Sequence, residues 1–275
     1  MNYNFKKYLK NLIPMLFIKK ISNTFQYYSF KGDYKNFKEI KKYLTPYDSK
    51  KIIERVKLMY KLSKINRFLN DRDGEVSLKK NLNFKLLKYL CIFLEKRSSK
   101  NSCVIDFGGS LANFYRTNTK YLNKYDTKWI IIENDKICKL GNKNIKNKNL
   151  YFFENINLAH KFIRERNLQT LFFLFGSSIQ YLDNFEKLLF KLKNLNPTYI
   201  IIDRQPILRS KATKCVIQKT PPWAGNLSFA VKLYNVQKLV NIINIHNFSL
   251  IDNFKAFGNQ FKDGEYRVMI FKKHA

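Results

Sequence analysis

The sequence predicts an α/β fold with a mostly parallel, doubly wound sheet, and three observations support this prediction. Short apolar runs alternate with segments long enough for one helix. The runs are continuous rather than alternately polar and apolar, which is typical of strands buried on both faces of a parallel sheet. A glycine turn follows the first run, and an acid ends the second. Strands are expected near Val104–Phe107, Trp129–Ile132, Tyr151–Phe153, Leu171–Phe175, Tyr199–Ile202, Ser249–Asn253 and Tyr266–Phe271.

Helical periodicity fills most of the intervals between these strands. The segment from Arg204 to about Phe229 differs, because prolines and Gly225 interrupt it. We predict a long loop there, and loops of that length in a compact domain are usually lids or binding loops. Helices are expected at about Leu111–Asn123, Asn134–Asn142, Ala159–Asn167, Asn184–Leu195 and Asn235–Asn244.

Residues 1–98 are predicted to form an N-terminal helical cap on a main domain of residues 99–275. Apolar residues recur at helical spacing over about 49–70 and 77–96. A basic amphipathic stretch over about 9–17 is expected to pack onto the main domain, and weak contact with an anionic membrane is the alternative.

The chain is strongly basic, with a net charge of +32 over 275 residues. Only ten of its 52 basic residues are arginine, and the lysines are scattered rather than gathered in blocks of like charge. This pattern favours a solvated, lysine-rich surface. Nucleic acid is therefore a less favoured partner than a small molecule.

The four cysteines and three histidines show no spacing typical of a disulfide framework or a metal site, so no metal is predicted. The apolar run Leu12–Ile18 contains Pro14 and is too short to span a bilayer. We predict no transmembrane segment and a cytoplasmic protein.

The strongest candidate site is Asp106-Phe107-Gly108-Gly109-Ser110, at the end of the first strand and in the turn that follows it. Glycines let the backbone turn sharply and approach a ligand closely. Glu133 follows the second strand, where its carboxylate can accept hydrogen bonds from ribose hydroxyls. The dinucleotide pattern Gly-x-Gly-x-x-Gly does not fit, because Leu111, Ala112 and Asn113 stand where it would need glycine. A turn that only reverses the chain is the alternative.

Ser177, Ser178, Gln180 and Tyr181 follow the fourth strand and should lie at the same edge of the sheet. Their hydroxyl and amide groups can hydrogen-bond a cofactor or an acceptor, and the Tyr181 ring can pack on a ring or face a sulfonium cation. Helix capping by the serines is the equally weighted alternative.

Asp203 and Arg204 end the fifth strand. Asp203 can take a proton from an attacking hydroxyl, and Arg204 can hold an anionic substrate or pair with Asp203. Glu154 follows the third strand and can meet an adenine amino group, although a solvated carboxylate is the favoured interpretation.

These residues resemble, in order, those of bacterial class I S-adenosyl-L-methionine-dependent methyltransferases whose genes accompany surface-polysaccharide genes. The resemblance covers almost the whole chain from about Phe30. It implies a Rossmann-like fold with a seven-stranded, mostly parallel sheet. The matching motifs are Phe30-x-Gly32-Asp33-Tyr34-Lys35-Asn36-Phe37, Pro46-Tyr47-Asp48, Arg72-Asp73-Gly74, Asp106-Phe107-Gly108-Gly109-Ser110-Leu111, Glu133, Ser177-Ser178-x-Gln180-Tyr181-Leu182, Asp203-Arg204, and Gln218 before Pro221-Pro222.

The resemblance implies S-adenosyl-L-methionine as cofactor and a sugar or other small polar acceptor in surface-polysaccharide biosynthesis. Ala112 stands where the family pattern has glycine. If the backbone there has a positive φ, alanine costs about 1–2 kcal/mol; if the position is helical, alanine is harmless. The implied cofactor site comprises Asp106, Gly108, Gly109, Ser110 and Glu133, with Ser177, Ser178 and Gln180 nearby, and the candidate catalytic residues are Asp203, Arg204 and Tyr181.

Two other functions stay open at this stage. The basic charge suggests an RNA or DNA methyltransferase, although the sequence contains neither Asn-Pro-Pro-Tyr nor Asp-Pro-Pro-Tyr. Ala112 and the lack of an obvious base suggest a non-catalytic binding protein with the methyltransferase fold.

Overall fold

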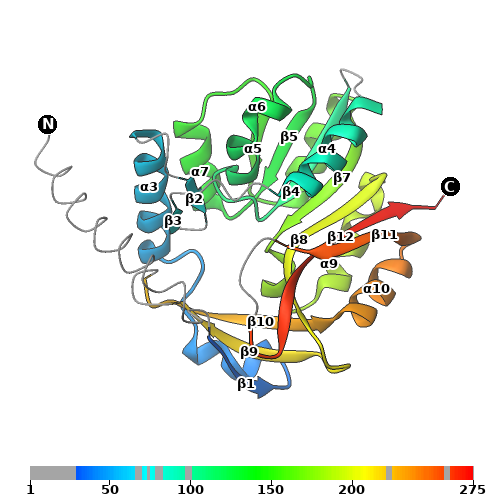
Figure 1. The fold of residues 1–275 in the computed structure, drawn as a ribbon. Coiled ribbons are helices and arrows are strands. Elements are labelled where there is room, and N and C mark those ends of the chain that lie inside the picture. The colour runs from blue at the N-terminus through cyan, green and yellow to red at the C-terminus, as the bar shows by residue number, and fades with distance from the viewer. Residues whose placement is uncertain are drawn as a thin grey trace, which may run out of the picture.

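Seven strands of the structure correspond to the strands that the sequence predicts. The computed structural model describes residues 29–65, 70–72, 75–77, 83–96, 101–220, 225–256 and 261–274. The seven strands are β4 (Ser102–Phe107), β5 (Lys128–Ile132), β6 (Leu150–Phe153), β7 (Gln169–Gly176), β8 (Tyr199–Leu208), β11 (Phe248–Lys255) and β12 (Gly264–Lys273). They lie in the order β6-β5-β4-β7-β8-β12-β11, and all except β12 run in the same direction (Figure 1).

The strand order reverses at β4. The chain leaves β4 toward β5 and β6, then returns to place β7 on the other side of β4. In doubly wound sheets, ligands bind over the carboxyl ends of the strands beside such a reversal. The fold therefore predicts a ligand site beyond the ends of β4, β5 and β7.

Over the described residues the sheet has ten strands, so the expected number of seven was wrong. The three additional strands are β1 (Ser29–Tyr34), β9 (Lys214–Lys219) and β10 (Ser228–Asn235), which form the antiparallel ribbon β1-β9-β10. This ribbon joins the sheet beside the end of β8, where Tyr234 pairs with Ile207 and Asn235 with Leu208.

The long loop predicted from Arg204 to about Phe229 was also wrong, because much of this segment is strand. β9 buries residues on both faces, with Val216 and Ile217 in separate apolar clusters. Its partners β1 and β10 satisfy its backbone, and one of them comes from the distant N-terminal region. Burial through long-range pairing thus outweighs the local proline and glycine signals.

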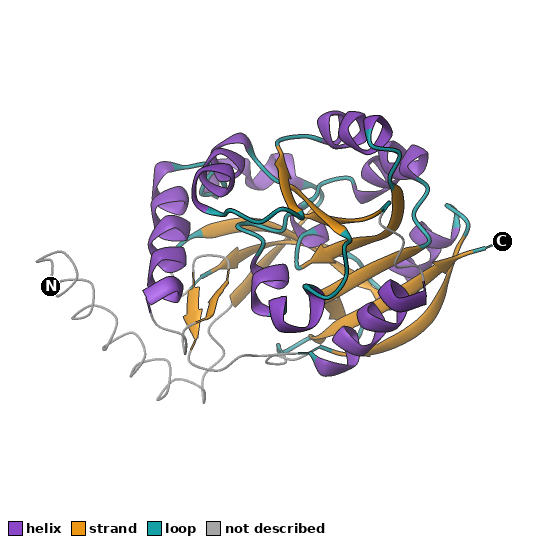
Figure 2. Cartoon of the chain, turned by 90° about the horizontal axis from the view of Figure 1, so that it is seen from above, coloured by secondary structure: helices purple, strands orange, loops and turns teal. Residues whose placement is uncertain are grey.

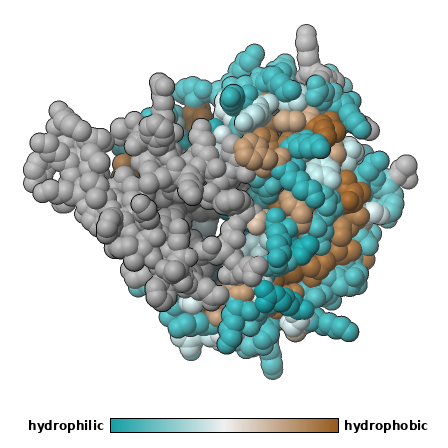
Figure 3. Space-filling view, in the orientation of Figure 1, coloured by the Kyte–Doolittle hydropathy of each residue, from teal (hydrophilic) through white to brown (hydrophobic). Residues whose placement is uncertain are grey.

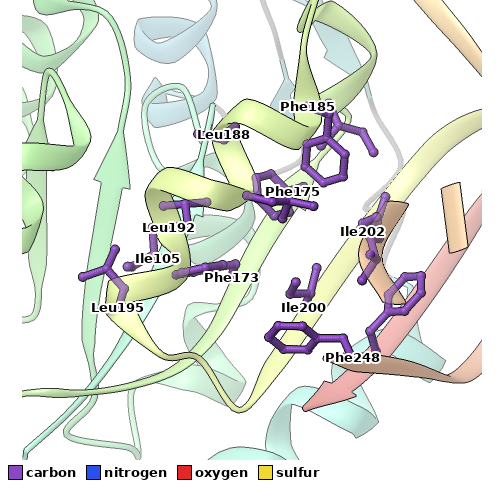
Figure 4. Close-up of a cluster of buried hydrophobic side chains, with 14 of the residues drawn as sticks. Ile105, Phe173, Phe175, Phe185, Leu188, Leu192, Leu195, Ile200, Ile202 and Phe248 are labelled. Carbon is purple, nitrogen blue, oxygen red and sulfur yellow. The ribbon is translucent and has the colours of Figure 1, made fainter. Parts of the chain in front are cut away.

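Helices cover both faces of the sheet (Figure 2). One face packs against α8, α9 and α10, and Figure 4 shows part of this core, with Phe173, Phe175, Leu188 and Leu192 among its buried side chains. The opposite face packs against α4, α5, α6 and α7. Their bounds are α4 (Phe84–Lys96), α5 (Asn113–Thr117), α6 (Thr119–Leu122), α7 (Asp135–Asn144), α8 (Ile156–Glu165), α9 (Phe185–Leu192) and α10 (Val236–Asn244).

Asparagine begins several of these helices. Its side-chain oxygen accepts a hydrogen bond from a backbone N–H of the first turn, which would otherwise lack a partner. Such a cap contributes about 1 kcal/mol. The capping residues are Asn36 for α2 (Phe37–Ile40), Asn134 for α7, Asn155 for α8, Asn184 for α9 and Asn235 for α10.

The predicted N-terminal helical cap is not confirmed, because residues from this region contribute to the sheet and to its covering layer. β1 pairs within the sheet, and α4 packs on it. α3 (Lys50–Ile65) places Ile52, Val56 and Tyr60 against Leu111 and α7. The amphipathic stretch predicted over residues 9–17 lies outside the described residues. The remaining short elements are η2 (Lys41–Tyr43), β2 (Asn70–Arg72) and β3 (Glu75–Ser77), of which β2 and β3 form a hairpin.

The surface in Figure 3 is hydrophilic over much of the visible face, with several separate hydrophobic patches between the hydrophilic residues. Across the part of the chain that the structure describes, no helix has the length and apolar character needed to cross a bilayer.

Asp252 of β11 ties α4 to the sheet. Its Oδ2 accepts hydrogen bonds from the Tyr89 hydroxyl at 2.7 Å and from Lys85 Nζ at 2.8 Å. Burial alone would raise the pKa of Asp252, but these hydrogen bonds outweigh burial and lower it. These hydrogen bonds therefore stabilise the fold fully at pH values above the unfolded carboxyl pKa of about 3.9. The stabilisation is lost as the pH falls through the lowered native pKa.

We expect Asp252→Asn to lower the free energy of unfolding at pH 7 by about 1 kcal/mol, because charged hydrogen bonds are lost. The difference from the wild type should disappear in acid, which urea denaturation across pH measures. Glu54→Gln, at a carboxylate whose side chain is 65% exposed, is the control and should change stability by less than about 0.5 kcal/mol. A difference that persists undiminished in acid would contradict this account.

Candidate functional site

The strand register brings the predicted site residues to one edge of the sheet. Phe107 pairs with Ile132, Asp106 with Leu174, and Gly176 with Asp203, so β4, β5 and β7 end at neighbouring positions beside Asp203 of β8. Backbone hydrogen bonds join them: Gly108 N donates to Ile132 O at 2.9 Å, and Ser177 N donates to Asp203 O at 2.9 Å.

Both glycines after β4 are needed for close packing. Gly108 has φ +70°, and a Cβ there would lie 2.8 Å from Ser178 Cβ. A Cβ on Gly109 would lie 2.7 Å from the Asp106 carboxyl group. Because real Cβ contacts are longer, any side chain would push the turn away from β7 or displace Asp106. The turn therefore seats directly against the segment that follows β7.

Asp106 is 1% exposed, and its Oδ2 accepts a hydrogen bond from Trp129 Nε1 at 3.2 Å. The carboxylate therefore lies beneath the glycine turn and is held by the second strand. Sequence reasoning missed the role of Trp129. Its position at the start of an apolar strand indicates burial, but nothing in the sequence shows which acceptor its indole N–H meets.

Left-handed backbone is concentrated at this edge. Among the described residues other than glycine, eight have positive φ, and four of these are asparagine, which tolerates that conformation. The other four are Ser110, Ala112, Ser177 and Arg204, with φ between 51° and 57°, and all four belong to the segments after β4 and β7 or to β8. Such strain costs about 1–3 kcal/mol per residue and gathers at functional sites.

A β-bulge shapes the end of the site on β8. Arg267 pairs with Gln205 and Met269 with Ile202, so two residues of β8, Asp203 and Arg204, oppose one residue of β12. Bulges re-aim side chains and are common beside active sites. Arg204 Nε donates to Asp203 Oδ2 at 3.2 Å, and both side chains are largely buried. The structure therefore contains the internal ion pair with Asp203, which was one of the two alternatives for Arg204.

Glu133 lies beyond β5 and is 8% exposed. Its Oε2 accepts hydrogen bonds from Asn134 N at 2.8 Å and from Asn134 Nδ2 at 3.2 Å, which fixes the carboxylate at the start of α7. The nearby Cys138 thiol donates to Glu133 O at 3.4 Å. Burial raises the pKa of Cys138 to about 12, so it stays a neutral thiol.

Several buried oxygen atoms at this edge have no hydrogen-bond partner among the described residues. They are Ser110 Oγ, Ser178 Oγ, Gln180 Oε1 and Gln205 Oε1. Leaving a buried polar atom unsatisfied costs about 1–3 kcal/mol. These atoms, together with the close-packed glycines, fit a polar ligand held against the turn.

Tyr181 belongs to η3 (Ile179–Tyr181) and is 36% exposed. Its hydroxyl donates to Gln218 Oε1 of β9 at 2.9 Å. Ser177 Oγ donates to Arg204 O at 3.3 Å, so this serine links β7 to the bulge instead of capping a helix. Glu154 is exposed, as the favoured interpretation expects. Within the described ranges, no group of three or more His, Cys, Asp or Glu side chains is arranged to hold a metal ion.

No protein-family model and no curated protein sequence matches this chain. Solved structures do match. The N-terminal domain of EvdMO1, crystallised in the presence of SAH and D-fucose, is 11% identical, with a TM-score of 0.51 over 82% of this chain and 100% of that one. Magnesium protoporphyrin IX methyltransferase (ChlM) from Synechocystis PCC 6803 with bound SAH is 10% identical, with a TM-score of 0.50 over 83% of this chain and 96% of that one. The chain therefore has a methyltransferase-like α/β fold with a mostly parallel sheet.

Ala112 has φ 55° and ψ 40°, so its backbone is left-handed, which is the conformation in which alanine is strained. We expect Ala112→Gly to raise the free energy of unfolding by up to about 1 kcal/mol, because relief of about 1–2 kcal/mol exceeds the loss of a buried methyl group worth about 0.8 kcal/mol. Chemical denaturation measures this. Asn196→Gly, also left-handed, is the control and should change little, since asparagine already tolerates φ 45°. A destabilised Ala112→Gly protein would show that the methyl group matters more than the strain.

Proposed function

We propose that this protein is an S-adenosyl-L-methionine-dependent methyltransferase that acts on a sugar or other small polar acceptor, such as a precursor of a surface polysaccharide. The observation that carries the proposal is the seating of the Gly108-Gly109 turn against Ser178, beside buried oxygens and a fixed Glu133. The fold supports the reaction class. Of the two similar structures, one was crystallised in the presence of SAH and D-fucose and the other with bound SAH.

The proposed cofactor contacts divide between two parts of this edge. Backbone N–H groups of the glycine turn, with Ser110 and Ser178, would hold the amino-acid end. Glu133 would accept hydrogen bonds from the ribose hydroxyls, and Gln180 would contact a further polar group. Asp106 is assigned an indirect role, because its carboxylate supports the turn from below.

The cofactor would supply an activated methyl group, so the protein has little covalent work to do. Its residues must align the acceptor and, for a hydroxyl nucleophile, remove a proton. Asp203 is the proposed proton acceptor. Its Oδ2 accepts a hydrogen bond from Arg204 Nε, which fixes the orientation of the carboxylate. Tyr181 is proposed to contact the acceptor directly, and its hydroxyl is oriented by Gln218.

We expect Glu133→Ala to weaken binding of S-adenosylhomocysteine by about a hundredfold, because two hydrogen bonds to a charged group are lost. Isothermal titration calorimetry of the purified full chain measures this. Asp135→Ala is the matched control: it removes a neighbouring carboxylate that is 47% exposed and paired with Lys139, and it should leave the affinity unchanged. Equal affinity in the wild type and Glu133→Ala would remove Glu133 from the site. Failure of the wild-type chain to bind would contradict the proposed function.

A further inference from the structure

Three partly exposed aromatic rings form a row beside the candidate site. Phe229 of β10 lies between Tyr47 and Tyr181, with ring centroids 6.1 Å from Tyr47 and 5.8 Å from Tyr181. Tyr47 is 41% exposed and Tyr181 is 36% exposed. We call Tyr47, Phe229 and Tyr181 the aromatic row. Its members come from three segments that are far apart in the sequence.

Hydrogen bonds hold the Tyr47 end of the row in place. Thr45 N donates to Ser228 O at 2.8 Å, and Ser228 N donates to Thr45 Oγ1 at 3.1 Å, which joins the Tyr47 loop to the start of β10. On the other side of Tyr47, Lys136 Nζ donates to Asp48 O at 2.7 Å. Lys136 lies in the first turn of α7, three residues after Glu133. The loop thus connects β10 with the proposed ribose-binding end.

The other end of the row adjoins the glycine turn. Tyr181 lies three residues after Ser178, which packs on Gly108, and η3 contacts β10. Phe229 packs against the apolar cluster that contains Leu111, the residue after Ser110. The row therefore runs along the proposed cofactor edge rather than on a separate surface.

The row combines apolar ring faces with a polar residue. Gln218 pairs with Phe229 across the ribbon, is 6% exposed, and accepts a hydrogen bond from the Tyr181 hydroxyl. Aromatic faces bind the C–H faces of a ring, and amide or phenol groups bind its hydroxyls. An uncharged saccharide ring presents both kinds of surface. A planar aromatic ligand would use the ring faces but would need fewer hydrogen bonds.

We infer that the aromatic row, with Gln218, is the acceptor subsite and that it binds an uncharged saccharide ring. This inference rests on the proposed function and goes beyond it, because it assigns acceptor binding to Tyr47, Phe229 and Gln218. The β1-β9-β10 ribbon supplies two of these residues, so it has a role in substrate recognition as well as in extending the sheet.

Saturation-transfer-difference NMR on the full chain tests the inference. The probes are D-fucose, D-glucose, D-galactose and N-acetyl-D-glucosamine, with phenol as the planar aromatic probe, each with and without saturating S-adenosylhomocysteine. We expect at least one sugar to bind, with the strongest saturation on its ring C–H protons. Tyr47→Leu and Phe229→Leu should weaken this binding roughly three- to tenfold. Both variants should keep the wild-type affinity for S-adenosylhomocysteine in calorimetry.

Phe190→Leu is the control, because Phe190 lies on α9 and is 70% exposed; it should bind sugar as the wild type does. Tyr47 is 41% exposed, so Tyr47→Leu should leave the protein folded even if Phe229→Leu does not. Sugar binding that is equal in the wild type and both row variants would overturn the placement of the subsite. Binding of S-adenosylhomocysteine with no sugar bound, or with phenol alone bound, would overturn the inference and leave the proposed function standing. Failure to bind S-adenosylhomocysteine would contradict the proposed function itself.

Discussion

The close approach of the backbone after β4 to the segment after β7 is the constraint on which the rest of the site depends. Gly108 and Ser178 leave no space for another carbon between them, and Gly109 leaves none above Asp106. This contact requires β4 to lie directly between β5 and β7, with all three strands ending near the same level. The buried apolar core on both faces fixes those levels. Packing of the core thus determines the geometry of a polar site at its edge.

The residues at the left-handed positions of the candidate site are not of the types that adopt this conformation readily. Elsewhere in the described chain, asparagine occupies the left-handed positions outside the glycines, as at Asn167 and Asn247. At the site, serine, alanine and arginine occupy them instead. Buried surroundings must hold these residues in place, since Ser110 and Ala112 are at most 2% exposed. The site is stable because the core around it is well packed.

Much of the sheet could be predicted from the sequence, and so could the strand ends that carry the candidate site, because both depend on local signals. Continuous apolar runs identify β4, β5, β7 and β8, and the residue that follows each run is read directly from the chain. The ribbon could not be predicted in this way. β9 is stable because it pairs with β1, whose residues are more than 180 positions away at Ser29 and Lys219. The partners of Trp129 and Tyr181 are equally nonlocal, at Asp106 and Gln218, so residue type alone does not reveal them.

β8 is long enough to pair with two different parts of the sheet. Its first half pairs with β7 at the proposed cofactor edge, and its end pairs with β10 of the ribbon. One continuous strand thus carries both regions, but their side chains come from different elements. Substitutions in β9, β10 or the Tyr47 loop can change the shape and polarity beside the edge without altering the glycine turn. The ribbon and the glycine turn can therefore change independently of each other, because β8 joins them without supplying the side chains of either.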